Sequence, residues 1–240
     1  MPNTNIAQFE NPHEKAQYVR SMFDRISAKY DLMNRLMTFG QDIRWRKLAI
    51  AETGLSQQGT LLDLGCGTGD LAFDALKVDP NLVVAADFSI DMVRTGQLKK
   101  NGQTNLVFTA ADGMALPFAD NFFDAAATGF VMRNVANIDQ FIAEMARVVR
   151  PGGRVVILEI TPFDKPLLKP FYRFYFHSIV PLIGGIVAGD REAYTYLPKS
   201  VDIFLSADEL KLRMEKAGMQ PVNYQLLNMG TVALHTGVVV

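Results

Sequence analysis

The chain is poor in the residues that build disulfides and metal sites. Its 240 residues include one cysteine, three histidines and one tryptophan. A single cysteine, Cys66, excludes an intramolecular disulfide and is consistent with a reducing compartment. Structural zinc sites are built from clusters of cysteine and histidine. This composition therefore argues against a zinc site, and we expect no metal.

A strong net charge and long apolar runs are also missing. The formal net charge is −1, which provides no basic field to attract nucleic acid. Residues 1–10 are polar and lack the apolar core of a signal peptide. No apolar run reaches the ~20 residues needed to cross a bilayer, and the run at 179–187 is broken by proline and glycine. We therefore expect a cytoplasmic protein without a transmembrane span.

The residues that are present indicate a globular α/β protein. Hydrophobic residues make up 49% of the chain and charged residues 20%, which suits a single domain over residues 1–240. The periodicity predicts a Rossmann-like, mostly parallel sheet of seven strands with helices on both faces. We expect helices at 11–53, the main sheet at 60–160, a helical insertion at 161–205, and a helix with a hairpin at 206–240.

The rest of the chain is arranged around the stretch at 61–70. Apolar residues at 61–64 lead directly into three glycines at alternate positions, and a helical pattern follows. This strand, turn and helix open a Rossmann-like sheet, and the helix start offers N–H groups to a polar ligand. The flanking Asp63 and Asp70 would repel a pyrophosphate but suit a cationic amino group, such as that of S-adenosylmethionine. The alternative is a glycine turn without a ligand. The glycines are Gly65, Gly67 and Gly69.

Two further acids follow predicted strands at the same edge of the sheet. Asp87 ends a strand at 82–86 and can accept both hydroxyls of a ribose. The alternative role for Asp87, a helix cap, is already filled by Ser89. Asp112 follows a strand at 106–110, where its side chain can accept the amino group of adenine. The alternative is a turn aspartate that bonds its own backbone.

Arg133 and Asn134 follow a fourth strand at 125–128. Ligands of open α/β sheets bind outside the carboxyl ends of the strands, and a buried arginine must be paired or must contact a ligand. One interpretation is therefore a clamp on an anionic oxygen. The alternative is a salt bridge from Arg133 to Asp70 or Glu159.

The second half of the chain contains an aromatic segment between predicted regular elements. A helix at 138–149, ended by residues 150–154, precedes a strand at 155–158. In the insertion at 161–205, aromatic side chains alternate with basic ones. Such a segment lies on a membrane surface, lines an apolar pocket, or is an ordinary core helix. A capping box at Ser206 then starts a helix, and two strands close the chain as a hairpin.

Seven segments of the chain carry a resemblance to one family. The sequence resembles the ubiquinone/menaquinone biosynthesis C-methyltransferases, which are class I S-adenosylmethionine-dependent methyltransferases. The likeness extends from about residue 12 to residue 237. The resembling segments are 30–34 (Tyr-Asp-Leu-Met-Asn), 62–71, 115–118, 130–135 (ending in Arg-Asn-Val), 151–154, 194–197 and 233–235.

The resemblance implies that S-adenosylmethionine is the co-substrate. It makes 60–160 the cofactor-binding sheet, 11–53 an N-terminal lid and 161–205 a substrate lid. At Gly129 this chain departs from the family, which has a serine there, so a hydroxyl contact is lost. The cofactor-binding candidates are Asp63, Gly65, Gly67, Thr68, Gly69, Asp87, Asp112, Gly113 and Gly129.

The implied reaction is methylation of a ring carbon on a reduced, prenylated benzoquinol or naphthoquinol. The alternatives are another lipid or phenolic acceptor, an NAD-dependent oxidoreductase, and a non-catalytic partner in a quinone-synthesis complex. The expected partners are the prenylated hydroquinone, the inner face of the membrane as a peripheral contact, and a homodimer or quinone-synthesis complex. The catalytic candidates are Arg133, Asn134 and His177, and the substrate-binding candidates are Tyr30, Asn34, Arg133 and Tyr194.

Overall fold

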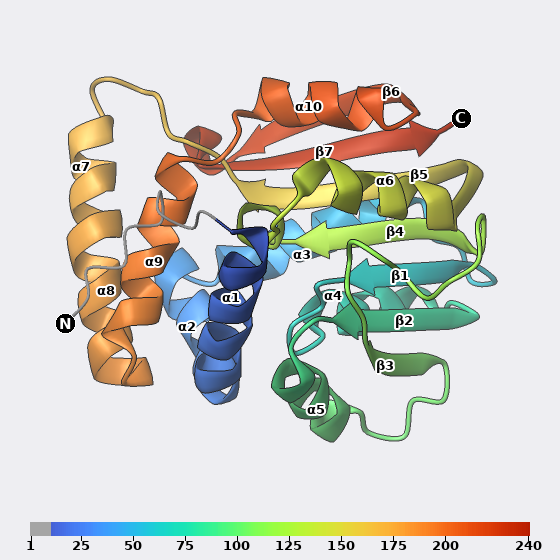
Figure 1. Cartoon of the computed structure of the whole chain (residues 1–240), viewed down its shortest axis with the longest axis horizontal. Helices are drawn as coiled ribbons and strands as arrows, with labels where there is room; N and C mark the ends of the chain where they lie inside the picture. The colour runs from blue at the N-terminus through green and yellow to red at the C-terminus, as the bar shows by residue number, and fades with distance from the viewer. Residues whose placement is uncertain (1–10) are drawn as a thin grey trace.

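The computed structural model describes residues 11–240, and its strands form one seven-stranded sheet (Figure 1). The expectation that residues 1–10 lack a signal-peptide core lies outside the described residues. The strand order is β3-β2-β1-β4-β5-β7-β6, with β7 antiparallel to both of its neighbours and β1 to β5 mutually parallel. The strands are β1 (Thr60–Leu64), β2 (Leu82–Asp87), β3 (Leu106–Ala110), β4 (Phe123–Gly129), β5 (Val149–Ile160), β6 (Met219–Leu227) and β7 (Val232–Val239).

Helices precede the sheet, connect its strands and form an insertion between β5 and β6. Their starts follow local capping chemistry, because Asn11, Ser89 and Ser206 each accept a backbone N–H from the first turn of the following helix. The α-helices are α1 (Pro12–Ile26), α2 (Tyr30–Thr38), α3 (Gln41–Thr53), α4 (Asp70–Ala75), α5 (Ile90–Lys99), α6 (Ile138–Val148), α7 (Lys169–Phe174), α8 (Val180–Ile183), α9 (Arg191–Asp202) and α10 (Ala207–Lys216). The 3-10 turns are η2 (Ser27–Lys29), η3 (Leu76–Val78), η4 (Met132–Asn134) and η7 (Asn228–Gly230), and the π-helical segments are η5 (Tyr175–Ile179) and η6 (Gly184–Ala188).

Apolar layers lie on both faces of the sheet. One layer packs α6 and α10 against the strands, and the other packs α3 and α4 against the opposite face. A third apolar cluster joins α1 and α2 to the helices of the insertion. Figure 1 shows this third group beyond the carboxyl ends of β1, β2 and β4. The predicted fold class is therefore confirmed.

The position of a ligand site follows from the strand order. The chain extends the sheet from β1 through β2 to β3, and then crosses to the other side of β1 to add β4. Connections therefore leave the carboxyl ends of β1 and β4 in opposite directions and leave a crevice between them. The helices of the third cluster stand over that crevice (Figure 1).

Two local predictions were wrong. Residues 150–154 do not simply end a helix; they belong to β5, which pairs with β4 on both sides of an irregularity. The insertion contains a continuous helix, Lys169–Ala188, that is not broken by Pro181. A proline ring clashes with the carbonyl four residues earlier, and here that carbonyl belongs to His177 within the wide π turn of η5.

This helix therefore also corrects the prediction that no segment is long enough to cross a bilayer. By length and composition it qualifies as a candidate span, and only 22% of its apolar window is buried in the protein. We refer to Lys169–Ala188 below as the surface helix.

Candidate active site

The glycine turn after β1 is a tight backbone cradle. The N–H groups of Gly65 and Cys66 both donate to the carbonyl of Ala86, at 2.7 and 3.0 Å. Gly65 has a φ of +68°, and a Cβ there would lie 2.5 Å from a methyl carbon of Val131. Both the backbone angle and the lack of space therefore require glycine at this position.

Asp87 closes the turn from the end of β2. One carboxylate oxygen accepts the N–H of Gly67 at 2.7 Å, and the other accepts the N–H of Ser89 at 2.8 Å. Burial raises the pKa of the Asp87 carboxyl. Ser89 caps α5 through Met92, as predicted, so Asp87 is not needed for that role. Each carboxylate oxygen keeps a lone pair for a further donor.

A cavity of about 600 Å³ lies over this cradle, and we call it the cofactor cavity. Gly65, Gly67 and Asp87 line it from β1 and β2, and Asp112 and Gly113 line it from the turn after β3. Asp112 also accepts the N–H of Met114 at 2.9 Å, so the predicted turn bond exists while the residue still faces the cavity. The glycines, acids and volume fit a nucleoside with a cationic side chain such as S-adenosylmethionine.

Four candidates do not line the cofactor cavity. Asp63 is fully buried, accepts the N–H of Ala72 at 3.0 Å, and has its other oxygen unpartnered within the described chain. The Thr68 hydroxyl donates to Asp31 of α2. Asp63, Thr68 and Gly129 instead line a small space of about 20 Å³ beside the turn, and Gly69 caps α4 with a φ of +91°. Burial raises the pKa of Asp63 to about 7.

A second cavity of about 340 Å³, the acceptor cavity, lies under the helical insertion. Its walls are largely aromatic and come from the N-terminal helices, the surface helix and α9. It contains all of the predicted substrate-binding residues. Tyr172 and Tyr175 belong to the aromatic segment for which the sequence left three roles open, and they line this pocket. The lining includes Phe23, Tyr30, Asn34, Phe39, Trp45, Phe130, Arg133, Asn134, Tyr172, Tyr175, Phe176, Tyr194 and Tyr196.

Arg133 pairs with a buried acid, and one of its N–H groups has no hydrogen-bond partner in the described chain. Its Nη1 donates to Glu159 at 2.6 Å and to the carbonyl of Phe130 at 2.7 Å. Glu159 is 1% exposed. The salt bridge to Glu159 considered from the sequence therefore forms, and the one to Asp70 does not. Within the described residues, Arg133 Nε and Asn134 Oδ1 are buried without a hydrogen-bond partner.

Other polar atoms in the acceptor cavity are also unpartnered. In the described chain, the hydroxyls of Tyr194 and Tyr196 are buried without a hydrogen-bond partner. Burial raises the pKa of Tyr196 to about 12 and that of Tyr194 further, so both remain phenols that can donate. Buried polar groups normally have partners. Both tyrosines line the acceptor cavity together with Arg133 and Asn134, so these unpartnered polar atoms belong to residues of one cavity.

His177 is not brought to this cluster. It lies on the surface helix, its Nε2 is 3.2 Å from a carboxylate oxygen of Asp202, and it lines neither large cavity. His177 therefore lies beside an acid of a neighbouring helix and away from Arg133 and Asn134 in the acceptor cavity. The described residues contain no cluster of histidine, cysteine and acids that could hold a metal.

Sequence reasoning missed the charges that fix the lid to the glycine turn. Asp42 is fully buried and pairs with Arg35 and Arg46, and both arginines also reach Asp70 at the start of α4. The i, i+4 spacing of Asp42 and Arg46 was the available signal. The cluster joins α2, α3 and α4, so the wall of the acceptor cavity is tied to the cofactor side.

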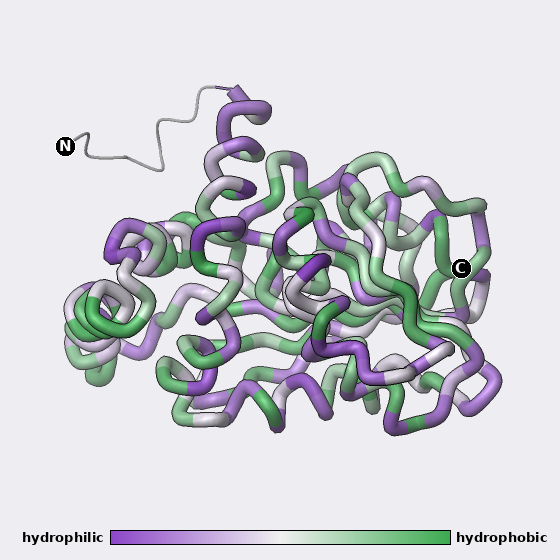
Figure 2. The backbone as a smooth tube through the Cα atoms, turned by 90° about the horizontal axis from the view of Figure 1, so that it is seen from below, coloured by the Kyte–Doolittle hydropathy of each residue, from purple (hydrophilic) through white to green (hydrophobic). Residues whose placement is uncertain are grey.

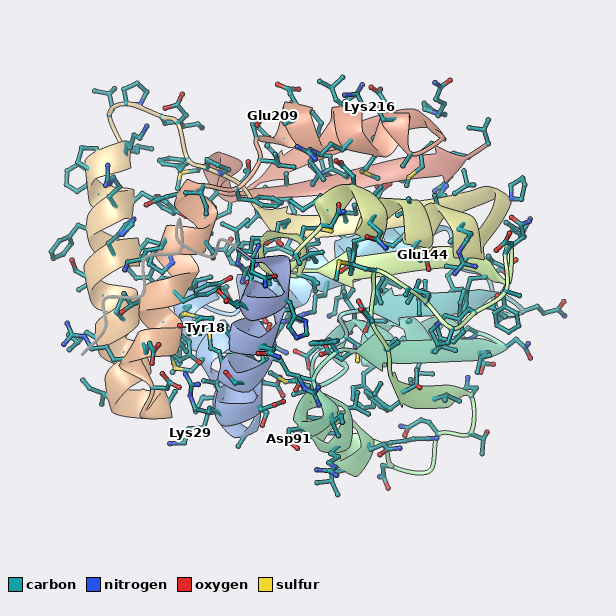
Figure 3. The ribbon with its side chains drawn as sticks, viewed as in Figure 1. Tyr18, Lys29, Asp91, Glu144, Glu209 and Lys216 are labelled. Atoms are coloured by element: carbon teal, nitrogen blue, oxygen red, sulfur yellow. The ribbon has the colours of Figure 1, made fainter. Side chains whose placement is uncertain are left out.

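The two large cavities meet. Phe23, Tyr30, Phe130 and Asn134 line both of them. The α1 helix covers this junction, and Figure 3 shows Tyr18 of α1 directed toward the insertion, where its hydroxyl donates to Glu192 of α9 at 3.1 Å. The arrangement can hold two ligands with their reacting ends adjacent, which suits transfer of a small group between them.

Comparisons with known proteins agree with this geometry. The chain matches the ubiE/COQ5 methyltransferase family over residues 12–239. It is 44% identical over 237 residues to a demethylmenaquinone methyltransferase of Roseiflexus castenholzii, covering 98% of each chain. It is 41% identical to a ubiquinone/menaquinone biosynthesis C-methyltransferase, UbiE, of Desulfotalea psychrophila, covering 93% of this chain and 91% of that protein. Its fold is similar to that of a SAM-dependent methyltransferase from Aquifex aeolicus, with a TM-score of 0.59, 21% identity, and coverage of 81% and 89%.

Proposed function

The chain belongs to the ubiE/COQ5 methyltransferase family, and we propose that it methylates a reduced, prenylated quinone precursor with S-adenosylmethionine as the methyl donor. The products are menaquinol from demethylmenaquinol, a methylated ubiquinol precursor, or both. Relatives named for each of these activities match nearly the whole chain. The observation that carries the proposal is the junction between the two cavities, one built for a nucleoside and the other aromatic with unpartnered polar atoms.

The cofactor cavity supports specific roles for its residues. Asp87 would accept the ribose hydroxyls, and Asp112 would accept the adenine amino group with its second oxygen. The free oxygen of Asp63 would attract the cationic amino group from the small space beside the turn. We assign Thr68 a backbone or positioning role, because its hydroxyl is already bonded to Asp31.

The acceptor cavity supports a role for Arg133 and Asn134 at the ring. When bound, S-adenosylmethionine supplies an electrophilic methyl group at the junction of the cavities. Arg133 and Asn134 line the cavity, and a charged donor of one (Nε) and an acceptor of the other (Oδ1) are buried without a partner in the described chain. Asn134 would accept a hydrogen bond from the ring hydroxyl of the acceptor, and Arg133 would stabilise the phenolate that makes the ring carbon nucleophilic once that hydroxyl has lost its proton.

The remaining residues orient the acceptor and exclude water. Phe23, Tyr30 and Phe130 surround the junction, and the hydroxyls of Tyr194 and Tyr196 would donate to the second ring oxygen. Alignment of this kind lowers a barrier by up to ~7–11 kcal/mol in the best intramolecular cases. Arginine is a poor base because its pKa is above ~12. A water held by Asn134 is our candidate for removing the hydroxyl proton, in preference to His177. After the methyl group has moved to the ring carbon, that carbon loses its own proton to water, which restores the aromatic ring.

The test is a methyl-transfer assay read by mass spectrometry. Purified protein and S-adenosylmethionine are incubated separately with chemically reduced demethylmenaquinol and with the demethylated ubiquinol precursor. We expect one of these to gain a methyl group on a ring carbon. Failure with both, while S-adenosylmethionine still binds, would refute the quinol assignment and favour another lipid or phenolic acceptor.

The proposal also covers the location of the enzyme in the cell and its assembly. We place it in the cytoplasm, in peripheral contact with the inner face of the membrane where its prenylated acceptor lies. Assembly as a homodimer or within a quinone-synthesis complex belongs to the same proposal, and size-exclusion chromatography with light scattering tests the homodimer.

A further inference from the structure

The surface helix carries an uncovered apolar face. Its exposed residues recur at spacings of three and four, which places them on one side of a helix. Phe171 and Ile186, at the two ends of this row, are 75% and 76% exposed. Monomeric proteins rarely expose a contiguous apolar strip of this kind without a partner. The row, which we call the outer face, consists of Phe171, Phe174, Ser178, Leu182 and Ile186.

The other side of the same helix is held firmly to the protein. Phe176, Val180 and Gly184 are buried against the cluster that includes α9. A Cβ on Gly184 would lie 2.3 Å from the ring of Tyr194, so the two helices are in close contact. Figure 1 shows the helix at the edge of the molecule, and in Figure 2 many of its turns are hydrophobic. A helix bound along its length can lie in a membrane interface but cannot cross the bilayer.

The charge around the outer face indicates which partner covers it. Residues 165–189 contain no aspartate or glutamate, although the whole chain has a net charge of −1. The same stretch contains exposed Lys165, Lys169 and Arg173. Lys169 pairs with Asp164, which lies just before the stretch. Basic side chains beside an exposed apolar row complement the anionic headgroups and acyl chains of a lipid surface.

Residues next to this face line the acceptor cavity. Tyr175 follows Phe174 of the outer face and lines the cavity, and its hydroxyl donates to the carbonyl of Met37 at 2.9 Å. Phe39 also lines the cavity, stacks on Tyr175 with ring centroids 6.0 Å apart, and is 78% exposed. Phe39 has a φ of +52°, an uncommon angle for a residue other than glycine. The chain thus presents a large apolar side chain at the rim of the cavity.

We propose that the outer face docks in the interfacial layer of an anionic bilayer, with the surface helix parallel to the membrane plane. The prenylated acceptor then passes from the bilayer into the acceptor cavity over the rim that Phe39 and Tyr175 form. The entrance rests on the proposed function for the nature of the acceptor, whereas the docking rests on the exposed face and its charge alone. Phe39 joins Phe171 and Phe174 in the lipid.

The first experiment measures binding of the full chain to vesicles of phosphatidylcholine with and without phosphatidylglycerol. We expect binding that is stronger with the anionic lipid, and a loss of at least about tenfold in the variant carrying Phe171→Ser and Ile186→Ser. The matched control carries Leu98→Ser and Leu212→Ser, which remove exposed leucines from α5 and α10, and it should bind like the parent.

Two results would overturn the docking. One is a parent protein that stays wholly in the soluble fraction or binds as well after the outer-face changes as before. The other is a parent dimer in sedimentation that these changes dissociate, because a second copy of the chain would then cover the face.

The second experiment distinguishes entry of the acceptor from the bilayer from the methyl-transfer reaction itself. The outer-face variant should retain methyl transfer to a short-tailed acceptor in detergent, and should lose at least about tenfold in rate with a long-tailed acceptor embedded in vesicles. Equal rates for variant and parent with the embedded acceptor would overturn the entrance. A parent that binds vesicles but methylates neither acceptor would refute the proposed function and leave the docking supported.

Discussion

At the scale of single residues, the main feature is a buried arginine that is only partly satisfied. Glu159 holds Arg133 through Nη1, while Nε remains without a partner in the described chain. Removing one partner of a buried pair leaves an uncompensated charge, which is strongly destabilising. Glu159 thus allows Arg133 to remain in an aromatic cavity and to present its remaining donor to a ligand.

Replacing Arg133 with lysine tests its role at the acceptor. Lysine keeps the charge and can still pair with Glu159, but it cannot donate in two directions from a planar group. We expect the Arg133→Lys variant to lose about 10²–10³-fold in kcat, as when a single charge-stabilising donor is removed. The affinity for S-adenosylmethionine, measured by calorimetry, should be unchanged.

The matched control is Arg150→Lys, at an exposed arginine that pairs with Asp124 and lines neither large cavity. It should have parental kinetics. An unchanged turnover for Arg133→Lys would refute the clamp on the acceptor oxygen.

Asp63 provides a prediction for pH dependence. Because burial raises the pKa of its carboxyl to about 7, folding favours the protonated form. The resulting stabilisation is fully present at low pH and is lost as the pH rises through 7. An asparagine at this position would remain neutral, so the stability of the Asp63→Asn variant relative to the parent should improve by about 2 kcal/mol between about pH 5.5 and about pH 8.5.

Urea denaturation at the two pH values measures this difference. The cofactor should be absent, because its amino group would stabilise the charged carboxylate. A difference that stays constant with pH, or that moves in favour of the parent, would show that Asp63 is already ionised in the folded protein at the lower pH.

At the scale of elements, the surface helix links the membrane face to the site. Its outer side is apolar and exposed, and its inner side supplies Tyr172, Tyr175 and Phe176 to the acceptor cavity. The helix stays continuous because the π turn of η5 relieves the clash that Pro181 would cause in an α-helix. Its close approach to α9 depends on the absence of a side chain at Gly184.

Gly184→Ala should disturb the acceptor cavity selectively. The added methyl would meet the ring of Tyr194 at 2.3 Å and force it to move. Overpacking of this kind costs about 1–3 kcal/mol of stability, and we expect a higher KM for the acceptor with unchanged cofactor affinity. Steady-state kinetics with each substrate varied in turn checks this.

The neighbouring Gly185→Ala is the control, because the atoms nearest to its Cβ would belong to the side chain of Arg191, at 3.3 Å or more. It should have kinetics close to those of the parent, with a small gain from the higher helix propensity of alanine. Similar KM changes in both variants would indicate a general effect on the helix and contradict a specific role for Gly184.

At the scale of the whole molecule, α1 connects regions that are distant in the sequence. It lines both cavities, its Arg25 pairs with Asp190 before α9, and its Asp24 accepts a hydrogen bond from Ser89 at the start of α5. The ion pair to Asp190 is partly exposed, and such pairs contribute only ~0–1 kcal/mol. The attachment of α1 therefore depends mainly on its buried side chains, Met22 and Ile26, in the third apolar cluster.

Cofactor binding should make α1 exchange its amide hydrogens more slowly. Ala16, Val19 and Arg20 line the cofactor cavity, so a bound ligand replaces solvent beneath the helix. A ligand at about 100 times its Kd adds ~2.7 kcal/mol of stability to the states that bind it. Hydrogen–deuterium exchange with and without S-adenosylhomocysteine measures the effect. The α10 helix, which lines neither large cavity, serves as the internal reference, and equal changes in α1 and α10 would contradict the prediction.

The sequence by itself determined the seven strands and their succession along the chain, the caps at Ser89 and Ser206, and the glycine turn beside Asp87. These features depend on periodicity and turn chemistry within a few residues, which the sequence displays directly. Family membership was also readable, because the Tyr-Asp-Leu-Met-Asn and Arg-Asn-Val segments are specific.

Only the tertiary structure decided which side chains meet. It paired Arg133 with Glu159 rather than Asp70, placed the Thr68 hydroxyl in a hydrogen bond to Asp31, and placed His177 beside Asp202. It also brought the two cavities together at Asn134. Such contacts join residues from separate elements, and their distances depend on how the lid helices pack over the sheet. No local pattern encodes that packing, because the same periodicity allows many arrangements of helices across the carboxyl ends of the strands.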